Sequence, residues 1–291
     1  MFFLVLSILG SVSVGIYLKI VKKFNASILQ MISFNYLITI ICSYFFFNVD
    51  LSVIPVSLPI VTISSLAILL PSIFLVQFYS IQYTGIIKTD IAQRLSLFIP
   101  IIAAIMIFNE VISSLRYIAL AIGLIAVYFI VDKPHKNQII EKKNRSFIYP
   151  LFVFLGFGII DIFFKQLALY SIIPYTSSLF YVFAAAFVIS ILINIFFYLK
   201  NKQTNFLELK SILLGIPLGL LNFLNIVCYM KAHREFAESP TTVFAGMNFG
   251  VILLGTLVGY FLFNEKLSKK NVLGLIMALI AVTLILISQQ K

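Results

Sequence analysis

Long apolar stretches alternate with short polar or charged breaks along almost the whole chain. A helix needs about 20 apolar residues to cross a bilayer. Within each stretch the apolar residues are continuous rather than alternating, which is typical of helices surrounded by lipid and by other helices. The sequence therefore predicts an all-α polytopic membrane protein with ten transmembrane helices, at about 2–18, 26–47, 58–83, 89–108, 114–131, 147–169, 175–199, 211–230, 240–263 and 271–288.

Composition narrows the class of protein further. Of the 291 residues, 62% are hydrophobic and 11% are charged, and the mean hydropathy is +1.10, whereas soluble domains carry about 25% charged residues. The longest connection, 132–146, is too short for a catalytic domain. These figures exclude a soluble enzyme, and they assign the net charge of +11 to loops rather than to a nucleic-acid partner.

The few thiols and imidazoles predict neither a disulfide framework nor a metal or cofactor site. Cys42 and Cys228 both lie inside apolar stretches and are interpreted as small buried hydrophobes. His135 and His233 both fall in expected loops, far from any other histidine, cysteine or acidic cluster.

The two halves of the chain match each other at fixed offsets. Asn109-Glu110 recurs as Asn264-Glu265 at an offset of 155, and the run Leu-Ile-Ala-Val at 124–127 recurs at 279–282. Earlier in each half, an offset of 146 aligns these pairs: Gly10 with Gly156, Lys19 with Lys165, Pro71 with Pro217, and Tyr83 with Tyr229.

A five-helix unit has an odd number of helices, so its repeat must enter the membrane from the opposite side. We therefore expect an inverted duplication with a first five-helix repeat at 1–131, a basic inter-repeat loop at 132–146 and a second repeat at 147–291.

These features resemble the drug/metabolite transporter superfamily, in particular its ten-helix EamA-like members. The resemblance covers nearly the whole chain. It rests on the five-plus-five plan, on Phe-Asn-Glu closing the fourth and ninth spans, and on the short link into the following Gly/Ala-containing helix. It implies a secondary transporter that moves a small metabolite or drug by alternating access through a cavity between the halves.

Basic residues are distributed unequally between the two sides of the predicted bundle. Loops after the odd-numbered spans hold fifteen of the 21 Lys and Arg residues, and the other side holds only Arg116, Lys231, Arg234 and Lys291. The positive-inside rule places the odd-numbered loops in the cytoplasm and both termini outside. The family resemblance implies the reverse orientation, and both alternatives stay open at this point.

Ionisable residues within spans are costly and therefore point to function. Asp161 and Lys165 stand at i and i+4 of the sixth span and share one helix face. Two interpretations stay open. Asp161 is a titratable or cation-binding carboxylate whose lysine partner is displaced during transport, or the two residues form a static buried ion pair, with Lys165 snorkelling toward the span's end.

Arg94 and a set of amides are the next candidates. Asp90 reads as an interfacial anchor, whereas Arg94 lies one turn deeper and is suited to bind a carboxylate. Gln93 matches Asn248 at the 155 offset, while Asn35 and Asn222 lie inside the second and eighth spans. Each amide alone is equally compatible with interhelical hydrogen bonding. Together they predict a shared polar cavity.

The two Asn-Glu pairs have a simpler interpretation. Each precedes a serine at the start of the next helix, so we expect an interfacial turn near a positive helix N-terminus rather than a gate.

The sequence thus predicts a ten-helix carrier of the inner (plasma) membrane that exports small organic solutes using the proton gradient. Asp161 is the expected coupling residue, and Lys165, Arg94, Gln93, Asn35, Asn222 and Asn248 are expected along the route. The expected partners are a small-molecule substrate, the lipid bilayer and protons, in a monomer or homodimer. The alternative is a membrane-embedded enzyme or a membrane assembly factor; an enzyme is disfavoured because no nucleophile motif or carboxylate cluster is present.

Overall fold

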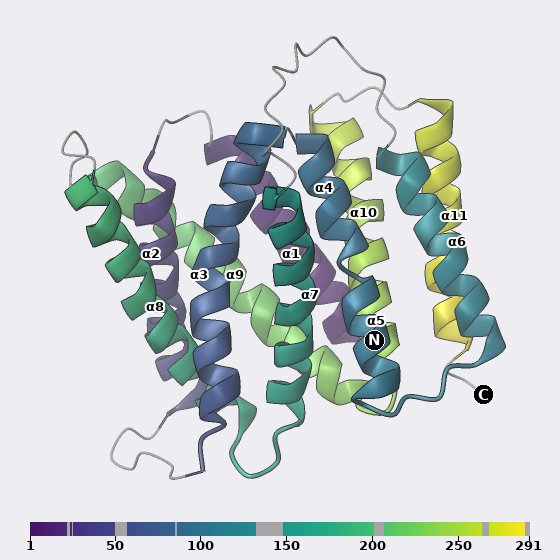
Figure 1. Ribbon diagram of the computed structural model, residues 1–291, viewed down its shortest axis with the longest axis horizontal. Coiled ribbons are helices and arrows are strands. Elements are labelled where there is room, and N and C mark those ends of the chain that lie inside the picture. Colours follow the sequence, from purple (N-terminus) through teal and green to yellow (C-terminus); the bar gives the residue numbers. More distant parts are fainter. Residues whose placement is uncertain are drawn as a thin grey trace.

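The computed structural model describes residues 1–21, 24, 26–49, 57–84, 86–131, 148–200, 207–263 and 268–288, and these residues form a bundle of α-helices (Figure 1). The helices are α1 (Phe2–Val21), α2 (Ile28–Phe47), α3 (Ile60–Thr84), α4 (Ile86–Leu95), α5 (Phe98–Met106), α6 (Ser114–Val131), α7 (Ile148–Leu169), α8 (Tyr175–Lys200), α9 (Leu209–Glu235), α10 (Pro240–Phe263) and α11 (Lys269–Ile287).

Eight of the described helices are long and apolar enough to cross a membrane, and two shorter apolar stretches lie at Ala92–Met106 and Ser114–Ile130. Apolar side chains such as Phe45, Phe46 and Phe261 stay exposed on the outside of the bundle, as expected where lipid replaces water. The chain is therefore a multi-pass membrane protein.

The fourth predicted span is interrupted, which differs from the continuous 89–108 helix expected. Helix α4 ends at Leu95, a turn covers Ser96 and Leu97, and α5 begins at Phe98. Proline has no backbone N–H, and its ring clashes with the carbonyl four residues earlier. Pro100 acts in this way on Ser96, so the break falls there. Pro71 and Pro217, by contrast, lie inside the continuous helices α3 and α9.

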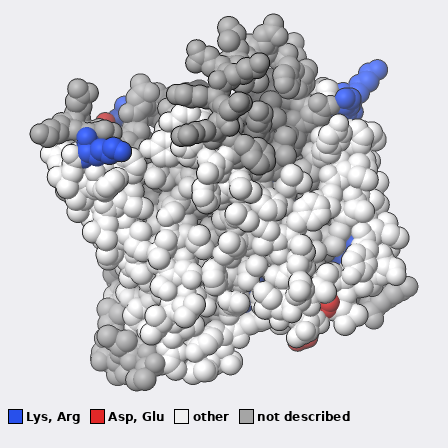
Figure 2. All heavy atoms as spheres, in the orientation of Figure 1, with Lys and Arg blue, Asp and Glu red and all other residues white. Residues whose placement is uncertain are grey.

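The helices alternate in direction, so their ends collect on two opposite faces. The terminal face holds the start of α1, the end of α11 and the connections α2–α3, α5–α6, α7–α8 and α9–α10. The basic face holds the other helix ends. Its described lysines are Lys19, Lys200, Lys210, Lys269 and Lys270. Figure 2 shows Lys and Arg mainly at the two upper corners of the molecule, and residues other than Lys, Arg, Asp and Glu over most of the drawn flank.

Three clusters of buried apolar side chains hold the described part of the bundle together. The larger core joins α1, α2, α3, α7, α8 and α9 and includes Val243 of α10, and the smaller core joins α5, α6, α10 and α11. A third, small cluster joins α1, α2 and α9 through Val21, Met31 and Leu218. Helices α6 and α11 pack along each other at one end of the bundle, and α2 packs on α8 at the opposite end (Figure 1). The helices between these two pairs surround the candidate site.

Candidate functional site

A cavity of about 550 Å³ lies among α1, α3, α4, α7, α9 and α10. Its wall extends from the middle of the bundle to Lys19 in the last turn of α1 and to Asn271 at the start of α11, both on the basic face. The polar groups around its middle include Gln77, Gln93, Arg94, Asp161, Asn222 and Asn248. Five of the seven residues that the sequence nominated therefore line one cavity; Lys165 and Asn35 are outside its described wall.

Asp161 lies on α7 and contacts α9 at the cavity wall. Its Oδ1 accepts a hydrogen bond of 2.8 Å from the hydroxyl of Tyr229. The Tyr229 ring packs edge-on against Phe164, with 6.0 Å between ring centroids. The carboxylate thus has one fixed partner at the cavity wall.

Lys165 does not pair with Asp161, so the predicted ion pair is wrong in this structure. Its side chain is fully buried rather than snorkelling, and its Nζ donates to the carbonyl oxygens of His233 (3.2 Å), Phe236 (3.3 Å) and Ala237 (2.9 Å). The carbonyls at the C-terminus of a helix have no partner within the helix and carry partial negative charge. The ammonium group therefore binds the carbonyls at the end of α9 instead of the Asp161 carboxylate.

Arg94 and Gln93 occupy the last turn of α4, just before the break in the fourth span. Arg94 is half-buried and lines the cavity. The Oε1 atom of Gln93 accepts a 3.0 Å hydrogen bond from Nε2 of Gln77 on α3. The break turns this polar end of α4 toward the cavity while α5 continues as an apolar helix. The side chain of Asp90 lies outside the described residues.

The other nominated amides divide between the cavity wall and the packing behind it. Asn248 lines the cavity from α10 and donates to the Phe244 carbonyl of its own helix at 3.0 Å. Asn222 lines the cavity from α9, and its Nδ2 donates to Oδ1 of Asn35 on α2 at 3.1 Å. Asn35 is thus a buried partner of the wall rather than a part of it.

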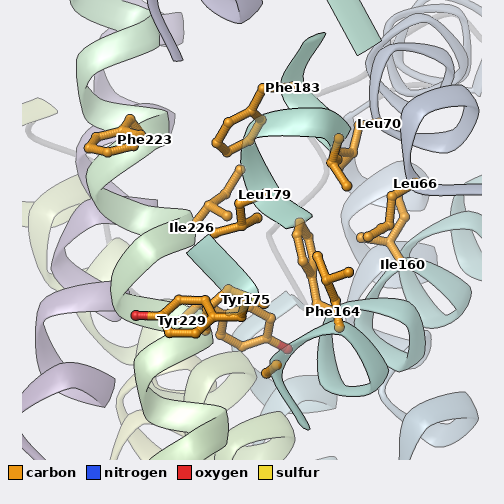
Figure 3. Close-up of a cluster of buried hydrophobic side chains, with 14 of the residues drawn as sticks. Leu66, Leu70, Ile160, Phe164, Tyr175, Leu179, Phe183, Phe223, Ile226 and Tyr229 are labelled. Atoms are coloured by element: carbon orange, nitrogen blue, oxygen red, sulfur yellow. The ribbon is translucent and has the colours of Figure 1, made fainter. Parts of the chain in front are cut away.

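The larger apolar core lies between the cavity and the terminal face. Figure 3 shows side chains from α3, α7, α8 and α9 meeting there, among them Leu66, Phe164, Leu179, Phe183 and Tyr229. Most of these side chains are less than 10% exposed. The cavity therefore has a polar wall that reaches one face and an apolar seal toward the other.

Glu110 lies in the turn between α5 and α6, as its sequence predicted, but its carboxylate contacts the N-terminus of α10 rather than that of the next helix. It is buried, pairs with Arg116, and accepts hydrogen bonds from the backbone N–H (2.9 Å) and hydroxyl (2.6 Å) of Thr241 at the start of α10. Arg116 also donates to Ser288 Oγ, at 3.1 Å. This cluster ties α6, α10 and α11 together at the terminal face. Asn264 and Glu265, the matching pair, lie outside the described residues.

His233 was expected in a loop but lies inside α9, where it is fully buried between Tyr229 and Phe244. The error arose because Lys231 and Arg234 suggested that the span had ended, whereas α9 continues to Glu235. His135 lies outside the described residues. The described part of the chain has no group of three or more His, Cys, Asp or Glu side chains that could hold a metal ion. Cys42 and Cys228 are free thiols.

Sequence reasoning missed Ser11 and Tyr36, which also line the cavity. Ser11 lies in an apolar first span with no charged residue, and Tyr36 follows the nominated Asn35 directly. A hydroxyl among mainly apolar neighbours is a weak sequence signal, because both spans carry other polar residues, such as Ser7 and Thr39. Among the described residues, the cavity wall offers a carboxylate, a guanidinium group and several amides inside an apolar bundle. It is suited to binding a polar solute.

Comparison with known proteins gives one relative with high coverage. No family model matches the chain. A protein of Haemophilus influenzae (strain ATCC 51907 / DSM 11121 / KW20 / Rd), described as uncharacterized, is 40% identical over 286 residues, which cover 96% of this chain and 95% of the relative. A protein of known crystal structure matches with a TM-score of 0.68 at 12% identity over 98% of each chain, so the two share a fold.

Proposed function

This chain belongs to the same family as the uncharacterized Haemophilus influenzae protein, and we propose that it is a secondary active transporter of small organic solutes. The observation that carries the proposal is the cavity: about 550 Å³ of space with Asp161 and Arg94 in its wall, inside a membrane-spanning bundle, extending to one face and sealed toward the other. Substrate sites near the bilayer midplane, at the interface of two repeats, are typical of such carriers.

An inverted repeat of two five-helix units, α1–α6 and α7–α11, is part of this proposal. In this plan α1 corresponds to α7, α2 to α8 and α3 to α9. The contact between α1 and α9 then has its counterpart in the contact between α7 and α3, and the contact between α2 and α9 has its counterpart in that between α8 and α3. The contacts α2–α8 and α6–α11 each join two corresponding helices, so each is its own counterpart. This exchange of neighbours is what a two-fold axis in the membrane plane produces, and it supports the EamA-like plan of the drug/metabolite transporter superfamily.

Two glycines at matching positions add to that support. A Cβ atom on Gly10 of α1 would lie 3.1 Å from the Cα atom of Asn225 on α9. A Cβ atom on Gly156 of α7, its partner at the 146 offset, would lie 2.5 Å from Cδ1 of Ile73 on α3. Each half therefore uses glycine where its first helix approaches the third helix of the other half, which allows close helix packing.

We further propose proton-coupled export across the inner membrane, with Asp161 as the coupling residue. A carboxylate within the membrane is costly and is typical of proton and ion pathways. Arg94 is the proposed site for an anionic group of the solute, because guanidinium binds carboxylate through two parallel hydrogen bonds. By the positive-inside rule the basic face is cytoplasmic, so the cavity described here extends to the cytoplasmic side.

The test compares metabolites inside and outside cells that express the chain, its Asp161→Asn variant or the matched control Glu208→Gln, at equal amounts in the membrane. Glu208 lies outside the cavity and accepts a hydrogen bond from Ser211, which a glutamine oxygen also accepts. We expect the chain and the control to move one or more solutes into the medium, and the Asp161 variant to lose this movement.

Two results would contradict the proposal. If the Asp161→Asn variant moved solutes into the medium as well as the unaltered chain, Asp161 would not be the coupling residue. A chemically altered product formed by the purified protein in liposomes, without counterflow of the unaltered solute, would instead favour a membrane-embedded enzyme.

A further inference from the structure

The turn between α9 and α10, residues 236–239, is held at both of its ends by buried charged residues. Lys165 on α7 donates to the carbonyls of His233, Phe236 and Ala237, which are the last acceptors of α9 and its turn. An ammonium group at a helix C-terminus offsets the partial negative charge there. Lys165 therefore fastens α7 to the end of α9.

On the other side of the same turn, Glu110 holds the start of α10. Its carboxylate accepts from the backbone N–H and the hydroxyl of Thr241, and an anion at a helix N-terminus is favourable for the same electrostatic reason. Because Glu110 is itself paired with Arg116, this side of the turn is anchored to α6. The turn is thus fixed from α7 and from the α5–α6 connection together.

This fastened turn lies on the terminal face, toward which the cavity is sealed. Helices α7 and α9 pack against each other there. Their counterparts in the first half, α1 and α3, do not pack along each other in the described residues, because the cavity lies between Ser11 on α1 and Gln77 on α3. One pair of equivalent helices is closed, and the other is separated.

The 146 offset aligns Lys165 with Lys19, and the two lysines have opposite surroundings. Lys165 is fully buried at the closed pair, whereas Lys19 is exposed and lines the cavity near the basic face, at the end of α1. Helix α3, the counterpart of α9, ends on the same basic face at Thr84.

We propose that Lys165 and Lys19 are alternating helix caps that close the cavity toward one face or the other. This inference rests on the proposed transport cycle. With Lys165 on the end of α9, the terminal face is closed and the cavity extends to the basic face. In the opposite state, Lys165 leaves α9, and Lys19 donates to the last carbonyls of α3 and closes the basic face.

The test measures access to a cysteine in the cavity and needs no knowledge of the solute. Ser11→Cys places a thiol in the cavity wall by a small change, in a background in which Cys42 and Cys228 are replaced by serine. A membrane-impermeant maleimide is applied to the terminal face and, in vesicles of opposite orientation, to the basic face. The ratio of the two labelling rates reports which face is open.

We expect Lys165→Met to raise the ratio of terminal-face to basic-face labelling by about tenfold, because charge-assisted hydrogen bonds then no longer favour the closed state. Lys19→Met is expected to lower that ratio, and the double variant to return toward the starting value. Lys165→Arg keeps a charged donor and retains most of the closure. Lys210→Met, which removes an exposed lysine at the start of α9, serves as the control.

A ratio within about twofold of the starting value in Lys165→Met would overturn the proposal, as would shifts of the same sign from both lysines. If Lys165→Met is not recovered as a monodisperse protein, Lys165→Gln, which keeps an amide donor without charge, carries the same expectation. If the two lysine variants shift the labelling ratio in opposite directions but the protein moves no solute, the proposal of alternating caps stands and the proposal of transport is overturned. Unchanged labelling, with solute movement still dependent on Asp161, would overturn the caps alone.

Discussion

In the proposed inverted repeat, the helix pairs α7–α9 and α1–α3 are counterparts, yet only α7 and α9 pack against each other in the described residues. Across α7–α9, Asp161 bonds to Tyr229 and, one turn further on, Lys165 bonds to the end of α9. Across α1–α3, the position matching Asp161 is Gly15, and the cavity separates the helices. The two pairs thus differ in their contacts, and buried polar groups bridge α7 to α9.

The largest expected effect concerns the anchor at the closed face. Glu110→Gln removes one partner of a buried ion pair and leaves Arg116 uncompensated, which typically costs about 3–5 kcal/mol. We expect a large drop in the thermal midpoint of the purified protein in detergent, measured by fluorescence-detected gel filtration after heating.

The double variant Glu110→Gln with Arg116→Met separates charge compensation from packing. Since both charges are then absent, we expect it to lose less stability than the single variant. A double variant as unstable as the sum of its two single variants would show that the ion pair is not what holds this face.

The contrast between the packed and separated helices is sharpened by two alanine substitutions on α7 and α1. A Cβ atom at Gly158 on α7 would lie 2.6 Å from Cβ of Ile99 on α5, whereas no counted atom of the described residues lies within 4 Å of a Cβ atom at Gly15 on α1. Overpacking costs about 1–3 kcal/mol, while alanine in a helix is favoured over glycine by roughly 1 kcal/mol.

Gly158→Ala should therefore lower the thermal midpoint, and Gly15→Ala should leave it equal or raise it, when both are measured in the same detergent. Equal losses at the two positions would mean that α1 is packed as tightly as α7, and the comparison would fail.

The fold was largely predictable because an apolar run of about 20 residues has few alternatives to a membrane helix. Cavity residues such as Asp161, Arg94 and Asn248 could be nominated because a polar group in such a run must face the protein interior. The partner of Lys165 could not be predicted. Spacing within one helix favours Asp161 as the partner, whereas the carbonyls that Lys165 actually binds lie at the end of α9, about 70 residues further along the chain. The contact from Glu110 to Thr241 is likewise long-range.

The smallest expected effect compares the tyrosines matched by the 146 offset. Tyr229 is buried and donates to Asp161, whereas Tyr83 is 53% exposed and stacks on Tyr149 with 5.1 Å between ring centroids. Interhelical hydrogen bonds in membranes average about 0.6 kcal/mol and reach about 1.7 kcal/mol. Tyr229→Phe removes such a bond between α7 and α9, so we expect a small loss in the thermal midpoint. Tyr83→Phe removes only an exposed hydroxyl and should leave the midpoint unchanged. A loss at Tyr83 equal to that at Tyr229 would show that the hydrogen bond to Asp161 is not what distinguishes the two tyrosines.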